Sequence, residues 1–95
     1  MGDYNPSILQ TGDVPECYLC HVPFPLQRHE IFGAENRHKS MREGLWINLC
    51  PDCHAQVHSH PLMYRYLKCD AEEIWLDRNG KEMADFRRLF GRNYL

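Results

Sequence analysis

The stretch LWINLCPDCHAQVH, residues 45–58, joins a strand signal, a cysteine pair and a helix start in direct succession. Residues 45–49 are rich in β-forming side chains and are bounded by glycine and proline, a pattern that predicts a strand. After Cys50 the pattern becomes helical, because proline suits the first helical position and Asp52 suits the positively polarised first turn. The stretch therefore predicts a strand that runs into a helix, with metal-binding residue types at the junction.

Four of the five cysteines form two Cys-x-x-Cys pairs. This spacing lets two sulfurs of one turn reach a common ion, and Zn²⁺ prefers four such ligands in a tetrahedron. Prolines flank the first pair and exclude a helix there, so the pair is predicted to lie in a loop that binds zinc. The alternative, that these cysteines are small apolar residues of the core, is less favoured. Cys69 lies outside both pairs and is predicted to be an ordinary thiol. The predicted ligands of a structural zinc are Cys17, Cys20, Cys50 and Cys53.

A second set of metal-binding residue types adjoins the second cysteine pair. His54 and His58 are four residues apart on the predicted helix, so their side chains lie on one face about 6 Å apart, which suits joint ligation of one ion. His29 and Glu30 are adjacent on a short strand predicted within residues 26–32, so they project to opposite faces. If the helix packs on this strand, at least one of the two faces the helical histidines.

Length and composition bound the answer. The chain has 95 residues, enough for one small domain. A domain of this size buries roughly 60–65% of the surface that its unfolded chain exposes, so a bound metal is a natural supplement to its core. The odd number of cysteines, their paired spacing and the lack of a signal-peptide pattern favour a reducing compartment. No stretch contains the roughly 18–20 apolar residues of a membrane helix. We therefore expect a soluble, cytoplasmic protein.

The remaining pattern predicts an arm at one end and helices at the other. Residues 1–14 contain turn-forming residues and are predicted to be a flexible, loose or extended N-terminal arm. Residues 33–44 are polar and predict a loop with room for one helical turn. Apolar residues at helical spacing predict helices over 62–76 and 83–90. The expected organisation is a single small α+β domain over residues 15–95, with a ββα core at about 16–60 and a helical extension over 61–95.

These residues resemble the HNH endonuclease family, the ββα-metal nucleases. The match consists of CYLC at 17–20, LQRHEIF at 26–32 and LWINLCPDCHAQVH at 45–58, while HEIFGAENR at 29–37 and FRRLFGRNYL at 86–95 look like small phage-associated members. The resemblance implies a ββα-metal core stapled by the four-cysteine zinc site, with a C-terminal helical extension. It also implies a bacterial host cell, with a phage or prophage as one source of the gene.

The resemblance implies that His54 and His58 bind a catalytic divalent ion together with one residue of the first strand. The family usually has His-His or Asp-His on that strand, whereas this chain has His29-Glu30, so two assignments remain open. In the usual register His29 is a metal ligand and Glu30 is the base. The opposite assignment is favoured here, because an imidazole has a pKa near neutrality and a glutamate, with a pKa of about 4.3, is a weak base.

The implied activity is metal-dependent hydrolysis of DNA phosphodiester bonds, with nicking and low sequence specificity, by His29, Glu30 and His54. Two histidines and a carboxylate would accept Mn²⁺, Ni²⁺ or Zn²⁺ readily, whereas Mg²⁺ prefers an all-oxygen shell. We expect DNA phosphates as the partner, no membrane, and a monomer or weak dimer. The residues predicted to contact phosphate are Arg28, Arg37, Lys39 and Arg42.

Two other functions compete with this one. A non-catalytic, zinc-stabilised nucleic-acid-binding module on an HNH-like scaffold is favoured by the unusual His29-Glu30 pair and by the formal net charge of −2. The family's middle asparagine also has no clear counterpart. A protein-interaction domain would instead use aromatic residues such as Trp46 and Trp75, but these are expected in the core. Metal-dependent cleavage separates the nuclease from both alternatives.

Overall fold

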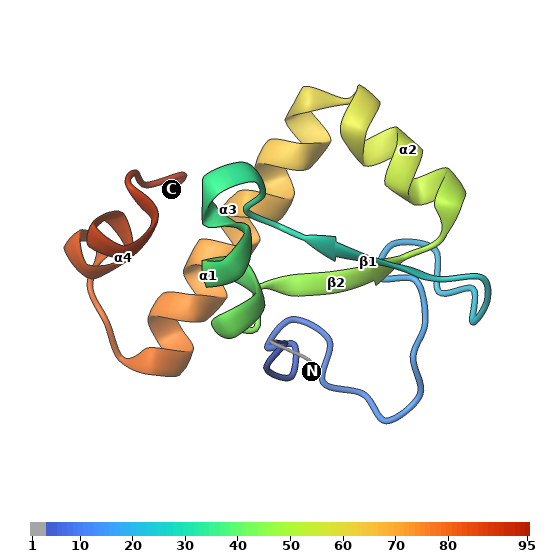
Figure 1. Ribbon diagram of the computed structural model, residues 1–95, viewed down its shortest axis with the longest axis horizontal. Coiled ribbons are helices and arrows are strands. Elements are labelled where there is room, and N and C mark those ends of the chain that lie inside the picture. The colour runs from blue at the N-terminus through green and yellow to red at the C-terminus, as the bar shows by residue number, and fades with distance from the viewer. Residues whose placement is uncertain (1–3) are drawn as a thin grey trace.

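The computed structural model describes residues 4–95, which form a two-stranded antiparallel sheet, four α-helices and one 3₁₀ turn (Figure 1). This is a small α+β arrangement, as predicted. In chain order the elements are β1 (Gln27–Glu30), η1 (Ala34–Asn36), α1 (Arg37–Arg42), β2 (Trp46–Leu49), α2 (Pro51–Ser59), α3 (Pro61–Asn79) and α4 (Met83–Phe90).

The two faces of the sheet have different neighbours. β1 pairs antiparallel with β2, with His29 opposite Ile47 and Glu30 opposite Trp46. Because successive side chains alternate between the faces of a strand, His29 and Ile47 share one face and Glu30 and Trp46 share the other. Helix α2 packs against the first face. The N-terminal segment lies below the sheet in Figure 1, and the ring of its Tyr4 lies 5.5 Å from that of Trp46 on the second face, measured between centroids. The register thus decides which side chains meet the helix.

The core joins the helix-covered face of the sheet to the C-terminal helices. Phe86 of α4 is fully buried, and its ring lies 5.5 Å from that of Trp75 of α3 and 5.5 Å from that of Phe32. Helices α3 and α4 therefore close the same core that the sheet and α2 begin. The largest fully buried apolar side chains are Phe86, Ile31, Leu45, Ile47, Leu49 and Val57.

The described part of the N-terminal arm lies along β2. Ser7 is 7% exposed, and its hydroxyl donates to the backbone carbonyl of Trp46 at 2.6 Å. The backbone N–H of Asn48 donates to Oε1 of Gln10 at 2.6 Å. These bonds satisfy backbone groups of a strand that has only one partner in the sheet. The part of the predicted arm over residues 4–14 has no helix or strand and packs along β2, and residues 1–3 lie outside the described residues.

The segment over residues 33–44, predicted as a loop with room for one helical turn, contains η1 and the short helix α1, so it is more helical than predicted. Although this segment is mostly polar, two of its side chains, Ser40 and Met41, are buried. The hydroxyl of Ser40 accepts the backbone N–H of Phe32 at 3.2 Å and donates to the carbonyl of Leu45. A helix this short is stabilised by such tertiary contacts rather than by propensity, which explains why its pattern was uninformative.

Helices α2 and α3 lie close to where the sequence predicts them. α2 ends at Ser59 and α3 begins at Pro61, so the proline redirects the chain as expected. α3 extends beyond the predicted residue 76 to Asn79, where Gly80 adopts the left-handed conformation with φ of 60° and closes the helix. Among residues 4–95, no helix is both long and apolar enough to cross a membrane.

Candidate metal centres

Four cysteine sulfurs converge where the loop before β1 meets the start of α2. The ligand atoms of Cys17, Cys20, Cys50 and Cys53 all lie within 4.8 Å of one another, and all four thiols are free. The sulfurs of Cys20 and Cys50 are 3.7 Å apart. Zinc–sulfur bonds of about 2.3 Å in a tetrahedron place the sulfurs roughly 3.8 Å from one another. The cluster is therefore compatible with a structural metal such as zinc.

Backbone amides point at two of these sulfurs. The N–H of Cys20 donates to the sulfur of Cys17 at 3.5 Å, and the N–H of Cys53 donates to the sulfur of Cys50 at 3.4 Å. Burial opposes ionisation of Cys17, but backbone hydrogen bonds outweigh it and lower its pKa to about 6. Burial and the neighbouring thiols raise the pKa of Cys53. Joint ionisation of the cluster therefore requires a bound cation.

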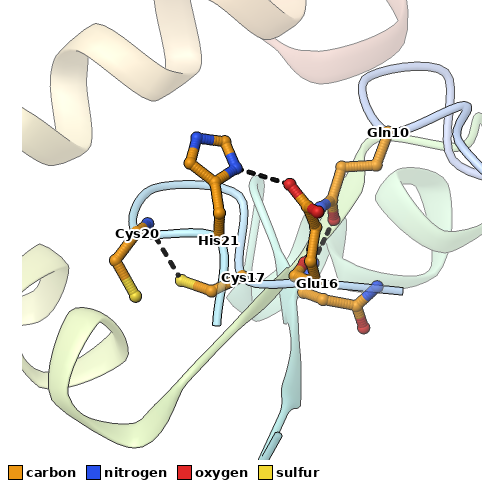
Figure 2. A network of polar contacts seen from close by, with 6 residues as sticks. Gln10, Glu16, Cys17, Cys20 and His21 are labelled. Atoms are coloured by element: carbon orange, nitrogen blue, oxygen red, sulfur yellow. Dashed lines mark hydrogen bonds and ion pairs between the residues drawn. The ribbon is translucent and has the colours of Figure 1, made fainter. Parts of the chain in front are cut away.

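The first knuckle is tied to the N-terminal arm (Figure 2). His21 follows Cys20 in the left-handed conformation, with φ of 69°, and its Nδ1 lies 2.5 Å from Oε2 of Glu16. The side-chain amide of Gln10 donates to the backbone carbonyl of Glu16 at 2.8 Å. The His21 ring is thus turned toward Glu16, and this residue is not part of the sulfur cluster.

A second cluster contains three imidazoles. His29 of β1 and the pair His54 and His58 of α2 place one ligand atom each within 4.8 Å of the others. The ring centroids lie 5.1 Å apart for His29 and His54, 5.4 Å for His29 and His58, and 4.8 Å for His54 and His58. The i, i+4 spacing on α2 brings its two histidines together as predicted, and the sheet register adds the third.

The environment of His29 suits an imidazole that binds a metal cation. Its side chain is 4% exposed, and its Nε2 is buried with no hydrogen-bond partner among residues 4–95. Burial and the nearby His54 and His58 lower the pKa of His29 to about 4, so its imidazole is neutral at pH 7. A neutral imidazole is the form that binds metals. An orphaned buried nitrogen costs free energy, and a cation among the three rings would offset that cost.

Gln27 orients one of the imidazoles. Nδ1 of His54 lies 2.6 Å from Oε1 of Gln27, an oxygen that only accepts, so Nδ1 carries the proton and donates. This tautomer leaves the lone pair on Nε2 of His54. Metal-binding histidines typically donate their other N–H in this way. Gln27 therefore acts as a supporting residue that sequence reasoning did not identify.

Replacing Gln27 by alanine is expected to weaken binding of a transition-metal ion at the histidine cluster by about 10-fold, the lower end of the effect of losing such a partner. The loss of orientation lets the His54 ring rotate away from the shared point. Calorimetric titration of the zinc-loaded protein with Ni²⁺ measures the effect. The matched control is Gln56→Ala, because Gln56 is exposed on the same helix as His54. Equal affinities for both variants would contradict the supporting role.

Glu30 lies apart from the three imidazoles. Its Oε1 is 2.9 Å from Nε of Arg37, and its Oε2 accepts the hydroxyl of Tyr4. Among the described residues, the group able to hold a metal contains His29 and not Glu30. The favoured assignment, with His29 as base and Glu30 as ligand, is corrected by this placement, because the strand alternation turns the imidazole and not the carboxylate toward α2.

Three of the four basic residues predicted to contact phosphate have intramolecular partners. The guanidinium of Arg28 lies 4.3 Å from the centroid of the Tyr4 ring, on the sheet face opposite the histidines. Arg37 forms the ion pair with Glu30 already described. The ammonium of Lys39 donates to a backbone carbonyl of α4 at 2.7 Å. The fourth, Arg42, is exposed at the end of α1. These side chains are not gathered around the histidine cluster.

Helix α3 contributes neighbours that the sequence pattern did not single out as functional. The ring of Tyr64 lies 5.4 Å from that of His29 and 5.8 Å from that of His58. The ammonium of Lys68, one turn later, lies 4.3 Å from the centroid of Tyr64. The spacing of Tyr64 and Lys68 along the helix is equally typical of residues that pack in the core. Only the path of α3 past the histidines shows that they lie beside the cluster.

No protein-family model, curated protein or solved structure matches the chain. The geometry of the two clusters is therefore the basis for a functional conclusion.

Proposed function

We propose that this protein is a metal-dependent endonuclease of the HNH type, which hydrolyses phosphodiester bonds of DNA and nicks it with low sequence specificity. Two antiparallel strands followed by a helix are the order that this family resemblance implies. The single observation that carries the proposal is the buried, partnerless Nε2 of His29 beside His54 and His58. A buried, neutral imidazole beside two further histidines, next to a separate cluster of four cysteines, suits catalysis better than it suits a second stabilising metal site.

The donor set decides which ion is expected. His29, His54 and His58 would hold the ion, and three imidazoles suit Zn²⁺ or Ni²⁺ better than the harder ions Mg²⁺ and Mn²⁺. Three protein ligands also leave coordination positions free, as in catalytic rather than structural sites. The bound ion would supply Lewis-acid polarisation of the phosphodiester and would offset the charge that develops on its oxygens.

The chain's own residues prepare the site. Burial keeps His29 neutral, and Gln27 holds His54 in the tautomer that leaves Nε2 free. His58 is exposed and Tyr64 lies beside it, so this side of the cluster is the approach for a phosphodiester. The cysteine cluster fixes the start of α2, because Cys50 caps the helix that carries His54 and His58. Two metal sites with different tasks thus share one helix.

The second candidate is a non-catalytic nucleic-acid-binding module. The His29-Glu30 pair, which departs from the family's usual first-strand pair, favours it over the nuclease. The internal partners of Arg28, Arg37 and Lys39 do not separate the two functions, because they remove predicted phosphate contacts from both. The formal net charge of −2 also argues for modest affinity for nucleic acid. A binding module would need no neutral, orphaned imidazole at its centre, which is why we place it second.

Cleavage of supercoiled plasmid tests the proposal. The zinc-loaded protein is dialysed free of other divalent ions and then supplied with Mg²⁺, Mn²⁺, Ni²⁺ or additional Zn²⁺. We expect nicked circles with Ni²⁺ or additional Zn²⁺, less product with Mg²⁺ or Mn²⁺, and none without an added ion, because imidazole ligands suit Ni²⁺ and Zn²⁺ better than the harder ions. An RNA of matched length tests the choice of nucleic acid. Intact plasmid with every ion, from folded protein that retains its zinc, would refute the nuclease and favour the binding module.

A further inference from the structure

Two clefts beside the histidine cluster share the residues Tyr64, Lys68 and Tyr94. The larger has a volume of about 380 Å³ and is also lined by Arg65 and Arg92. The smaller, of about 260 Å³, continues toward the segment after β1. Lys68 lies on the wall common to both. Three cationic side chains and two phenols are thus collected from α3 and the C-terminal tail.

Two of the three cations in this region are held by aromatic rings instead of carboxylates. The ammonium of Lys68 lies 4.3 Å from the centroid of Tyr64 and 5.3 Å from that of Tyr94. The guanidinium of Arg92 lies 5.1 Å from the centroid of Tyr94. Within residues 4–95, neither of these cations nor Arg65 forms an ion pair. A cation–π contact positions a cation but leaves its N–H groups free for an anionic acceptor.

The tail that carries two of these residues is fixed by a buried carboxylate. Glu72 of α3 is fully buried and accepts the backbone N–H groups of Tyr94 at 2.6 Å and Leu95 at 3.2 Å. The side-chain amide of Asn93 donates to the same carboxylate at 2.7 Å. The negative charge of Glu72 is thereby directed at the tail, so the wall that carries Arg92 is formed before any ligand arrives.

The clefts and the histidine cluster are separated by a single ring. Tyr64 lines both clefts and also lies 5.4 Å from His29 and 5.8 Å from His58, measured between ring centroids. Burial and the positive charge of Arg92 lower the pKa of Lys68, which indicates that positive charge is crowded here and that an anion would relieve it. An anion in the cleft would therefore be adjacent to a group held at the imidazoles.

We propose that Arg65, Lys68 and Arg92 form a phosphate-binding cleft that holds the DNA backbone next to the phosphodiester at the histidine cluster. This inference rests on the proposed function and deepens it by assigning where the strand lies. The cleft would supply the phosphate contacts that the sequence predicted for Arg28, Arg37, Lys39 and Arg42. It recognises the charge of the backbone and reads no base, in keeping with low sequence specificity.

Binding of a short fluorescein-labelled DNA duplex, measured by anisotropy over a range of salt concentrations without added divalent ion, tests the cleft. We expect the double variant Lys68→Gln/Arg92→Gln to bind at least 10-fold more weakly and to lower the slope of log K against log salt by about 1.8, because each lost phosphate contact removes about 0.9. The matched control is Arg78→Gln/Lys81→Gln, which removes the same charges at exposed positions near the end of α3. It should retain affinity within about twofold, and Lys68→Arg, which keeps the charge, should bind like the unmodified chain.

The outcomes separate this inference from the nuclease. Unchanged affinity and salt slope in the Lys68→Gln/Arg92→Gln variant would overturn the cleft, while plasmid cleavage by the unmodified protein would leave the nuclease intact. Weakened binding by that variant, in a protein that cleaves no plasmid with any ion, would support the cleft and refute the nuclease. Equal loss in the Arg78→Gln/Lys81→Gln control would overturn the cleft, since the effect would then follow net charge and not position.

Discussion

The Cys50→Ser variant is expected to lose its zinc and to unfold. Cys50 is 7% exposed, its sulfur lies 3.7 Å from that of Cys20, and it caps α2 directly after the strand β2. Structural zinc contributes about 10–16 kcal/mol to the folding of small zinc domains at neutral pH. The whole stability of a domain is only about 5–15 kcal/mol, so loss of the ion exceeds what the remaining core supplies. Serine retains the cap but is a poor zinc ligand.

Thermal melting followed by circular dichroism, together with the zinc content of purified protein, measures this effect. The matched control is Cys69→Ser, because the Cys69 thiol donates to the backbone carbonyl of Tyr94 at 3.0 Å and a serine hydroxyl can make the same bond. That control should hold its zinc and melt close to the unmodified chain. A cooperative melt of Cys50→Ser at the unmodified temperature would show that the sulfur cluster does not stabilise the fold.

The His54→Ala variant is expected to lose plasmid cleavage while keeping its fold and its zinc. The substitution removes one of the three imidazoles, and the loss should be roughly 100-fold or more, since removing even a supporting residue of a metal ligand costs about 10–100-fold. His54 is only partly buried and its one hydrogen bond is to Gln27, so the cost in stability is small. His58→Ala should behave in the same way, because His58 belongs to the same cluster.

Rates of nicking with saturating Ni²⁺ or Zn²⁺, compared at equal protein concentration, give the measurement. The control is His38→Ala, because His38 is exposed on α1 and is not part of the three-histidine group. It should cleave at the unmodified rate. Cleavage retained in His54→Ala would reject the assignment of the site, whereas loss in His38→Ala as well would point to a general effect on folding or DNA binding.

The local parts of both sites could be predicted from the sequence. The proximity of the two sulfurs within each Cys-x-x-Cys pair follows from the spacing, because both belong to one turn and need no distant contact. His54 and His58 share a face because the helix has a fixed period, and the helix itself begins at a proline after a capping residue. Short-range geometry decided each of these features, so the pattern of residues was sufficient.

Features that depend on contacts between segments far apart in the sequence were decided only by the tertiary structure. Strand alternation requires that His29 and Glu30 point to opposite faces, but only the packing of α2 on one face decides that the imidazole enters the site. The partners of the basic residues predicted to contact phosphate, the packing of α1 and the position of the N-terminal arm depend on such contacts as well. Lys68 and Tyr64 read as ordinary helical residues until α3 is seen to pass beside the histidines, because sequence fixes a helix face but not its neighbour.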